Sequence, residues 1–221
     1  MINLVAVIGK AGSGKNTILS NFANRHKETN FITILNHDLG LTTFNTVFNM
    51  VIPFTTRPMR PGEREGVDYH FITKDRALQL IDLGQVAQYA VFNDWIYGTL
   101  FEDYDEHKIN LGIYTPKAIN NLNYKDNFNI TTVYITADDK ERMMRQLKRE
   151  KNPDVHEIAR RFLADEIDFD EEIINKLPNV IRIKNPDINT EAFLHTPNPN
   201  DIFERVATYN YSQNDELIWT K

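Results

Sequence analysis

The stretch INLVAVIGKAGSGK, residues 2–15, decides how this chain folds. Residues 2–8 are short, rich in β-branched side chains and followed by glycine, which is typical of a buried strand. Residues 9–15 fit the pattern G-x-x-x-x-G-K, and a helical spacing of apolar residues follows over 15–27. A glycine-rich loop between a strand and a helix turns its backbone N–H groups toward phosphate oxygens, and the helix N-terminus adds positive partial charge. The sequence therefore predicts a phosphate-binding loop.

Lys15 of this loop is expected to reach the phosphate that is transferred and to neutralise the charge that develops on it. The residue after the lysine is usually Ser or Thr, whose hydroxyl meets Mg²⁺, but here Asn16 and then Thr17 follow. Either Asn16 supplies an amide oxygen to the metal or to one of its waters, or Thr17 packs and the metal is held by phosphate and water. The residues expected to bind the phosphates are Gly9, Lys10, Ala11, Gly12, Ser13, Gly14, Lys15, Asn16 and Thr17.

Apolar segments alternate with helical patterns along most of the chain. This alternation is typical of an α/β fold with a mainly parallel central sheet flanked by helices. Strands are expected at residues 2–8, 31–35, 69–72, 86–92, 95–98, 130–136 and 180–183, and helices at 15–27, 74–83, about 138–151 and about 154–175. Residues 36–50 have no clear period, and residues 53–66 are expected to form a loop rich in Pro, Gly and Arg.

The composition excludes several classes of protein. The 221 residues include 25 Lys and Arg against 31 Asp and Glu, a formal charge of −6, whereas a general nucleic-acid binder carries a basic excess, so we expect no stable nucleic-acid binding. The chain has no cysteine, which excludes disulfides and thiolate chemistry and favours a reducing compartment. No apolar run reaches the ~18 residues that cross a bilayer. We therefore expect a cytoplasmic protein that does not bind membranes; the oligomeric state is left open.

The most informative segment is TTRPMRPGEREGVDYHF, residues 55–71. Arg57 and Arg60 lie three positions apart in a loop that prolines stiffen, and such a pair suits the bidentate capture of a phosphate. Tyr69 adds a hydroxyl donor nearby, and Tyr97 and Thr99 offer two more after a strand. The segment therefore predicts a second phosphate site, separate from the loop at residues 9–15.

Three motifs in this order, the loop at residues 9–15, the segment 55–71 and the Y-G-T element at 97–99, resemble the guanylate kinase family. The resemblance spans about residues 2–185. It implies a P-loop NTPase fold over residues 1–195, with an inserted acceptor-nucleotide-binding subdomain at about 53–100 and a helical lid at about 140–165; residues 196–221 would be a C-terminal extension. It also implies ATP and a nucleoside monophosphate as substrates, Mg²⁺ as cofactor, and in-line transfer of the γ-phosphoryl group without a covalent intermediate.

The resemblance carries over to individual side chains. By it, Arg57, Arg60, Tyr69 and Tyr97 would hold the phosphate of the acceptor nucleotide, Thr99 would face its base, and Asn185 would approach the adenine of ATP. Arg161 matches a lid arginine positioned for transfer. The other lid arginine of the family aligns with Glu150 here, so we expect Arg149 or Arg145 to take its role. The expected catalytic residues are Lys15, Arg60, Arg161 and Arg149.

The residues that read guanine in the family differ in this chain. The family uses carboxylates that accept from the base, but the first aligns with Gln88 and the second, in the strand before Thr115, with Gly112 or Tyr114. A serine that meets the guanine oxygen aligns with Pro53. Since a lost charge-assisted hydrogen bond weakens binding by about 1.5–3 kcal/mol, our hypothesis is an acceptor whose base is not necessarily guanine, read by Gln88 and Tyr114. Residues 36–50 would be an insertion that could supply further base contacts.

Three alternatives remain at this point. The chain could be a catalytically silent binding module with the guanylate-kinase-like fold, although the intact loop at residues 9–15 weighs against this. It could instead phosphorylate a non-nucleotide acceptor such as a phosphorylated sugar, or a base within a polynucleotide, which the acidic charge disfavours. The basic residues between 140 and 151 could also be an exposed helical face, which is the usual meaning of such a run.

Overall fold

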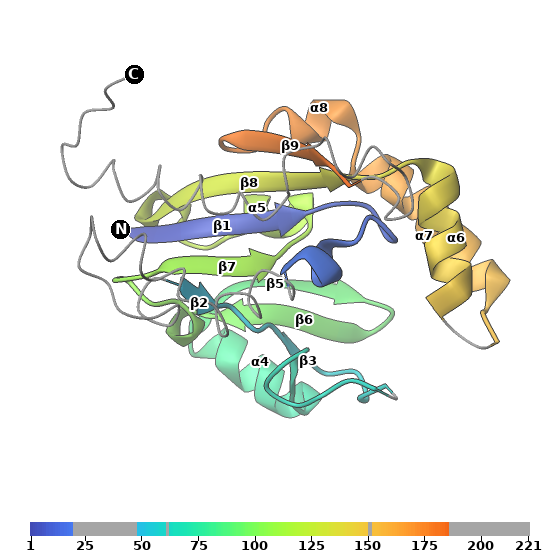
Figure 1. Cartoon of the computed structure of the whole chain (residues 1–221). Coiled ribbons are helices and arrows are strands. Elements are labelled where there is room, and N and C mark those ends of the chain that lie inside the picture. Colours follow the sequence, from blue (N-terminus) through green and yellow to red (C-terminus); the bar gives the residue numbers. More distant parts are fainter. Residues whose placement is uncertain (20–47, 61, 150–151, 186–221) are drawn as a thin grey trace, which may run out of the picture.

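The computed structural model describes residues 1–19, 48–60, 62–149 and 152–185. Its centre is a five-stranded sheet (Figure 1) that contains, in spatial order, β2 (Phe48–Met50), β7 (Ile109–Ile113), β1 (Ile2–Ile8), β8 (Phe128–Thr136) and β9 (Val180–Lys184). Every pair of neighbouring strands in this sheet is parallel. The expected α/β fold with a mainly parallel central sheet is therefore confirmed.

Strand β1 is buried on both of its faces. Leu4 and Ile8 belong to an apolar cluster on one face of the sheet, whereas Val5 and Val7 belong to a second cluster that includes Leu19 from the start of the following helix. A strand covered on both faces is expected to be apolar without alternation, which is what residues 4–8 show. The carboxyl end of β1 leads directly into the glycine-rich loop, at the right-hand side of Figure 1.

A smaller sheet lies beside the central one (Figure 1) and contains, in spatial order, β4 (His70–Phe71), β3 (Phe54–Thr55), β6 (Trp95–Leu100) and β5 (Val86–Phe92). Helix α4 (Lys74–Asp82) packs on it through Ala77 and Leu80, which meet Phe54, Val86 and Ile96. The antiparallel strands β5 and β6 are joined by a tight turn in which both central residues have positive φ. The role of this region as an acceptor-binding subdomain stays a prediction.

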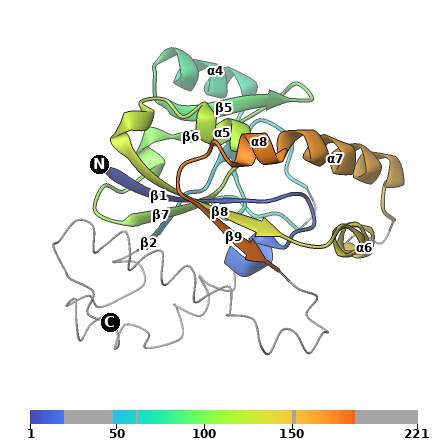
Figure 2. The same ribbon diagram turned by 90° about the horizontal axis from the view of Figure 1, so that it is seen from above.

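Two helices lie at the end of the central sheet where the carboxyl ends of its strands meet. Figure 2 shows α6 (Asp139–Arg149) and α7 (Val155–Asp168) together beyond the carboxyl ends of β1 and β8. The remaining elements are short: α5 (Pro116–Asn120), α8 (Glu171–Ile174) and the 3₁₀ turns η1 (Phe101–Asp103) and η2 (Lys125–Asn127). No helix within the described ranges combines the length and the apolar character that crossing a membrane requires.

The single helix expected over residues 154–175 is wrong, because the structure has two helices there. Helix α7 ends at Asp168, and the side chain of Asp170 accepts from the backbone N–H of Glu172 to begin α8. The expected loop at 53–66 is wrong at its start, where β3 forms. Strand β7 was not predicted from periodicity, since Asn110 interrupts its apolar pattern; the Asn110 amide is buried and donates to the carbonyl oxygens of Asn3 and Asp105.

Other expected elements fall partly or wholly outside the described residues. Helix 15–27 is described to Leu19, and the expected strand at 31–35, most of the 36–50 segment and the extension at 196–221 are not described. Of the segment 36–50, the described end forms β2, which pairs with β7 at one edge of the central sheet.

Candidate functional site

The phosphate-binding loop begins directly after β1 and ends where a helix begins at Lys15. The backbone N–H of Ser13 donates to the carbonyl of Lys10 at 3.2 Å, and that of Ile18 donates to Gly14 at 3.0 Å. Gly12 has φ +78°, and a Cβ there would lie 2.5 Å from the backbone oxygen of Arg142. Glycine is therefore needed at position 12 both for its left-handed backbone and for the close approach of another chain segment.

The Lys15 side chain lies against its own loop. Its ammonium donates to the backbone oxygens of Gly9 and of Lys10, the second at 3.1 Å. Burial lowers the pKa of Lys15 to about 8, Asp165 acts in the opposite direction, and Arg142 lowers the pKa further. The ammonium is charged at neutral pH and lies at the base of the loop that is expected to hold phosphates.

Asn16 and Thr17 are exposed in the first turn of the helix. Their amide and hydroxyl oxygens are hard ligands of the kind that Mg²⁺ accepts. Among the described residues, no group of three His, Asp or Glu side chains is arranged to hold a metal ion. The Asn16 and Thr17 oxygens are therefore donors of a kind that fits a Mg²⁺ ion.

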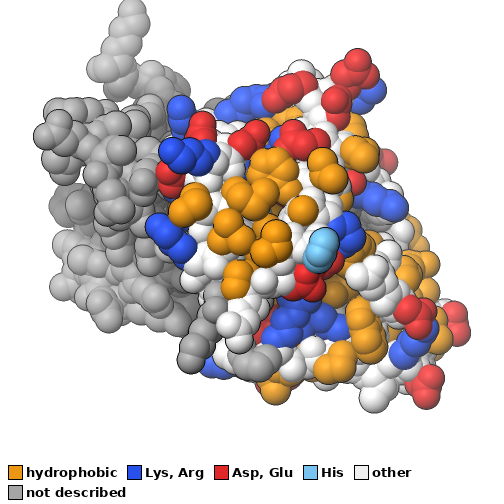
Figure 3. Space-filling model, turned by 90° about the vertical axis from the view of Figure 1, so that its right-hand side faces the viewer, with side chains coloured by type: hydrophobic (Ala, Val, Ile, Leu, Met, Phe, Trp, Pro, Cys, Tyr) orange, Lys and Arg blue, Asp and Glu red, His pale blue; other side chains and the backbone are white. Residues whose placement is uncertain are grey.

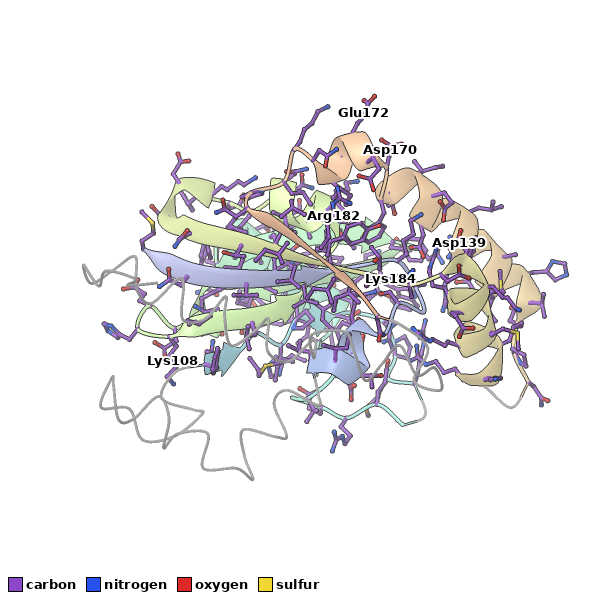
Figure 4. The ribbon with its side chains drawn as sticks, turned by 45° about the horizontal axis from the view of Figure 1, so that its top comes forward. Lys108, Asp139, Asp170, Glu172, Arg182 and Lys184 are labelled. Carbon is purple, nitrogen blue, oxygen red and sulfur yellow. The ribbon has the colours of Figure 1, made fainter. Side chains whose placement is uncertain are left out.

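Asn185 follows β9 and lies against the same loop. Its side-chain amide donates to the backbone oxygen of Ser13 at 2.7 Å, and a Cβ at Gly14 would meet that amide nitrogen. Figure 4 shows Lys184, at the end of β9, on the side of the sheet where Asp139 begins α6. Asn185 is thus beside the phosphate-binding loop, while its predicted contact with adenine stays a prediction.

The loop after β3, which carries Arg57 and Arg60, brings three of the predicted residues together: Arg57, Tyr69 and Tyr97. The Arg57 guanidinium is 6% exposed and lies 5.1 Å from the ring centre of Tyr69, whose ring meets that of Tyr97 edge-on at 6.1 Å. The guanidinium also pairs with the carboxylate of Glu63, a residue that the sequence reasoning missed. The backbone N–H of Arg60 donates to the same carboxylate at 2.8 Å, while the Arg60 side chain is exposed.

Two of the positions expected to face the acceptor base, Thr99 and Tyr114, are linked by a buried chain of hydroxyls. The Thr99 hydroxyl lies 2.9 Å from that of Tyr104, which lies 2.9 Å from that of Tyr114. Gln88 pairs with Thr99 across β5 and β6, and a Cβ at Gly112 would meet the Tyr114 ring at 2.7 Å. Burial raises the pKa of Tyr114 well above its ordinary value, so its phenol stays protonated. Tyr104, the centre of this chain, was not predicted.

The arginines predicted to act from the lid are held in different ways. Arg161 donates to Glu157 at 2.7 Å, and Arg160 donates to the same carboxylate with two nitrogens. Arg149 is exposed at the last position of α6, whereas Arg145 donates to the backbone oxygen of Gly12 at 3.3 Å. Glu150, which aligns with a family arginine, lies outside the described residues.

Helix α7 also contacts the smaller sheet. The Arg160 guanidinium lies 4.9 Å from the ring centre of Phe92, at the end of β5. Figures 1 and 2 show the glycine-rich loop and the loop after β3 on the same side of the molecule as α6 and α7. On this side, viewed directly in Figure 3, basic side chains lie among acidic and apolar ones. The two predicted phosphate sites therefore share one side of the molecule.

Arg142 contacts the phosphate-binding loop from α6, and it was not predicted from the sequence. Its side chain is 1% exposed and donates to the backbone oxygen of Ala11 at 3.1 Å and to Asp165 at 3.1 Å. Glu166 pairs with Lys10 of the loop at 2.6 Å. A cavity of about 190 Å³ lies between the loop, the end of β8 and the start of α6. It is lined by Lys10, Ser13, Tyr134, Ile135, Thr136, Ala137, Asp139 and Arg142.

Comparison with known proteins gives one consistent family. A family model described as guanylate kinase matches residues 1–176. A guanylate kinase of Synechococcus sp. (strain JA-3-3Ab) is 34% identical over 96 residues, which cover 43% of this chain and 36% of the relative. A guanylate kinase of Schizosaccharomyces pombe is 33% identical over 95 residues, which cover 43% of this chain and 38% of the relative. The alignments thus span less than half the length of these relatives.

A solved structure gives the same fold at low sequence identity. The crystal structure of guanylate kinase from Anaplasma phagocytophilum aligns with a TM-score of 0.50 and 15% identity, and the alignment covers 99% of this chain and 88% of that one. At this identity the likeness concerns the fold alone, and it is the P-loop NTPase fold that the sequence predicted.

Proposed function

Because the chain belongs to the guanylate kinase family, we propose that it is an ATP-dependent nucleoside monophosphate kinase that transfers the γ-phosphoryl group of ATP to the acceptor's phosphate. The observation that supports this most is the position of two phosphate-type sites on one side of the molecule, the loop with Lys15 and the loop with Arg57. ATP and a nucleoside monophosphate are accordingly the proposed substrates.

In the proposed reaction, Lys15 neutralises charge on the phosphoryl group as it moves, and the backbone of residues 9–17 holds the phosphates of ATP. Such a reaction depends on alignment and charge neutralisation, with little covalent chemistry for the protein to perform. Asn16, with Thr17 beside it, would hold a Mg²⁺ ion or its waters, and the bound ion would supply further neutralisation of phosphate charge.

Arg57 and Arg60, with the hydroxyls of Tyr69 and Tyr97, are proposed to hold the acceptor's phosphate. The contact of Arg57 with the Tyr69 ring and of that ring with Tyr97 supports a common site. Glu63 would keep the Arg57 guanidinium oriented until a phosphate binds, since it already holds two of its N–H groups.

The lid is proposed to close over the phosphates and exclude water, which would protect ATP from hydrolysis. Arg161 and either Arg149 or Arg145 would then approach the transferred group. Arg145 already donates to the phosphate-binding loop, at Gly12, whereas Arg161 would have to exchange Glu157 for phosphate.

The acceptor base is proposed to be read by Gln88, Thr99 and Tyr114, and not necessarily to be guanine. Gln88 is 7% exposed and its amide both donates and accepts, whereas a carboxylate accepts only. The Tyr114 hydroxyl bonds that of Tyr104, and a hydroxyl can both donate and accept. With no carboxylate at these positions, the strongest basis for selecting the N1–H and amino group of guanine is absent.

A panel of ribo- and deoxyribonucleoside monophosphates with each of the common bases, incubated with ATP and Mg²⁺, tests the proposal. Chromatography of the products should show a nucleoside diphosphate and ADP in equal amounts, with at least one acceptor. Formation of no diphosphate from any acceptor would overturn the kinase proposal. A clear preference for GMP or dGMP over all other acceptors would leave the kinase standing and overturn the altered base selection.

A further inference from the structure

Ala11 of the phosphate-binding loop is held by both of its backbone groups. Its N–H donates to a carboxylate oxygen of Asp165, on α7, at 2.6 Å. Its carbonyl oxygen accepts from Nε of Arg142, on α6, at 3.1 Å. Arg142 and Asp165 are in turn joined by a hydrogen bond of 3.1 Å. The three residues close a ring of contacts between the loop and two helices that follow it by more than 120 positions.

Arg142 has a fixed orientation within this ring. Its guanidinium also donates to Asp139 at 2.6 Å and to Glu166 at 3.3 Å, and it lies 4.4 Å from the ring centre of Phe162. Arg142 is 1% exposed, so a side chain that left these partners would keep a buried charge unpaired. A lysine could not reproduce this pattern, because it lacks the planar fork of donors.

Two further contacts tie the same part of the loop to the same helices. Lys10 pairs with Glu166, and Gly12 lies so close to the backbone of Arg142 that a Cβ would meet its oxygen at 2.5 Å. All these contacts fall on residues 10–12, before the helix that begins at Lys15. The helices therefore fix the first half of the loop, and the second half, at the helix N-terminus, is the part that faces phosphates in such loops.

We propose that Arg142 and Asp165 are positioning residues for ATP: they clamp Ala11 so that the phosphate-binding loop keeps the conformation that the triphosphate needs. Neither residue is required to touch a substrate. The inference rests on the proposed function in that it takes ATP as the ligand of the loop. It goes beyond that function because the residues lie outside every motif that carries the family resemblance.

We call Arg142 and Asp165, with the hydrogen bonds that they make to Ala11, the clamp. It has a consequence for Lys15. Asp165 is the carboxylate that favours the charged form of this lysine, while Arg142 opposes it. Removing the Asp165 carboxylate therefore leaves the positive charges of Lys15 and Arg142 near each other without the negative charge that favours both. Replacing Asp165 by Asn keeps an oxygen that can accept from Ala11 but removes the charge, so the two effects can be separated.

The test measures ATP binding to the full chain by calorimetry, with Mg²⁺ and without an acceptor, for Asp165→Ala, Asp165→Asn, Arg142→Met and Arg142→Lys. The Ala and Met variants should raise the dissociation constant of ATP about tenfold or more, since each loses a charge-assisted hydrogen bond to the loop. Asp165→Asn should fall between Asp165→Ala and the unmodified protein. The controls Asp168→Asn and Lys140→Met change exposed charges on the same two helices and should stay within about twofold.

Steady-state kinetics supply a second readout. The KM for ATP should rise in the Ala and Met variants while the KM for the acceptor changes little, because Arg142 and Asp165 hold the loop at residues 9–15, which is the proposed ATP site. Dissociation constants within twofold of the unmodified protein, or an equal rise in both KM values, would overturn the proposal. So would a loss of folding in all four variants at 25 °C, checked by circular dichroism, because the residues would then be structural.

The two proposals fail in different ways. If the unmodified protein binds ATP but transfers no phosphoryl group, the kinase proposal fails, and the binding constants still decide whether the clamp positions the loop. If transfer occurs and the variants bind ATP normally, the clamp proposal fails alone. A protein that binds no ATP would overturn both.

Discussion

The Arg57 guanidinium and the Glu63 carboxylate form two parallel hydrogen bonds, of which the Nη1–Oε2 bond measures 2.7 Å. Glu63 also accepts from the backbone N–H of Arg60, so one carboxylate organises both arginines of the loop. The two oxygens of a carboxylate present to guanidinium the same edge as a phosphate does. The pair therefore holds the Arg57 guanidinium in the orientation in which we propose that it binds the acceptor's phosphate.

Replacing Glu63 by Ala should lower the free energy of unfolding by about 3 kcal/mol, because the largely buried Arg57 would lose its partner. Urea unfolding measures the change. The matched control is Glu65→Ala, two residues along the loop, where the pair with His70 is exposed. Its cost should be about 1 kcal/mol or less. Equal losses for the two variants would contradict the importance assigned to the Arg57 pair.

The same pair predicts a dependence of stability on pH. The hydrogen bond from Arg57 holds the pKa of Glu63 below its ordinary value of 4.5. The unfolded chain then binds more protons than the folded one in the acidic range, so this part of the stability is present above about pH 4.5 and is lost as the pH falls. Glu63→Gln should lack this component. The difference between the urea midpoints of the unmodified protein and Glu63→Gln should shrink as the pH is lowered from 6 to 3. A difference that stays constant over this range would rule the linkage out.

Much of the fold could be predicted because burial leaves a clear pattern in a parallel sheet. β1 and β8 are apolar runs next to recognisable loop or cap residues, and their ranges were foreseen nearly to the residue. β7 was not predicted from periodicity, since Asn110 and Gly112 break its apolar run. The buried Asn110 is tolerable because its amide bonds both the nearby Asp105 and the distant Asn3, and the second of these contacts is not visible in the sequence. The break between α7 and α8 depends on a cap at Asp170 that a continuous helical pattern conceals.

The site shows the same division. Lys15 and Arg57 stand in local motifs whose chemistry is visible in the sequence. Arg142 and Asp165 stand in no motif, and a charged residue on an amphipathic helix is usually exposed. The packing of α6 and α7 beside the glycine-rich loop buries Arg142 and leaves Asp165 largely covered. Glu63 could have been found, as an acid six positions from Arg57 in a short stiff loop, whereas Tyr104 carries no such signal.

Lys15→Met should reduce kcat/KM for ATP by at least about a thousandfold, because it removes the charge that we propose neutralises the transferred group. The fold should persist, since methionine retains much of the side chain's apolar length. Thermal unfolding and the rate of ADP formation are the measurements. Turnover near that of the unmodified protein would contradict the role of Lys15 in the proposed reaction.

The lowered pKa of Lys15 gives this role a pH signature. With a value of about 8 in the folded protein, the ammonium is charged at pH 7 and loses its proton above pH 8, so kcat/KM for ATP should fall on the alkaline side. Between pH 8 and the ordinary value of 10.5 the unfolded chain binds more protons, so this group's contribution to stability rises with pH. Unfolding of Lys15→Met over pH 7–10 should lack that rise. A flat rate profile up to pH 10 would be incompatible with the shift.

Gln88→Glu tests the base-reading position directly. A carboxylate there should accept from the N1–H and amino group of guanine, and should raise the ratio of kcat/KM for GMP to that for AMP about tenfold to a hundredfold. Gln88→Leu is the control, since it keeps an apolar body without a polar tip and should lower activity without favouring guanine. An unchanged ratio in Gln88→Glu would mean that position 88 does not face the acceptor base.

The hydroxyl chain of Thr99, Tyr104 and Tyr114 predicts unequal costs for removing two similar groups. Tyr104→Phe deletes the central hydroxyl and leaves the hydroxyls of both buried neighbours without this partner, so the free energy of unfolding should fall by about 2–3 kcal/mol. Tyr114→Phe deletes a terminal hydroxyl, Tyr104 still bonds Thr99, and the loss should be about 1 kcal/mol.

The double variant Tyr104→Phe with Tyr114→Phe shows whether the three hydroxyls depend on one another or contribute two independent hydrogen bonds. It removes the Tyr114 hydroxyl that Tyr104→Phe leaves unpaired, so its cost should be smaller than the sum of the single costs. Urea unfolding of the three variants at pH 7 measures the cycle, and burial keeps the Tyr114 phenol protonated there. Additive costs, or a Tyr114→Phe loss as large as that of Tyr104→Phe, would show that the three hydroxyls do not act as one chain.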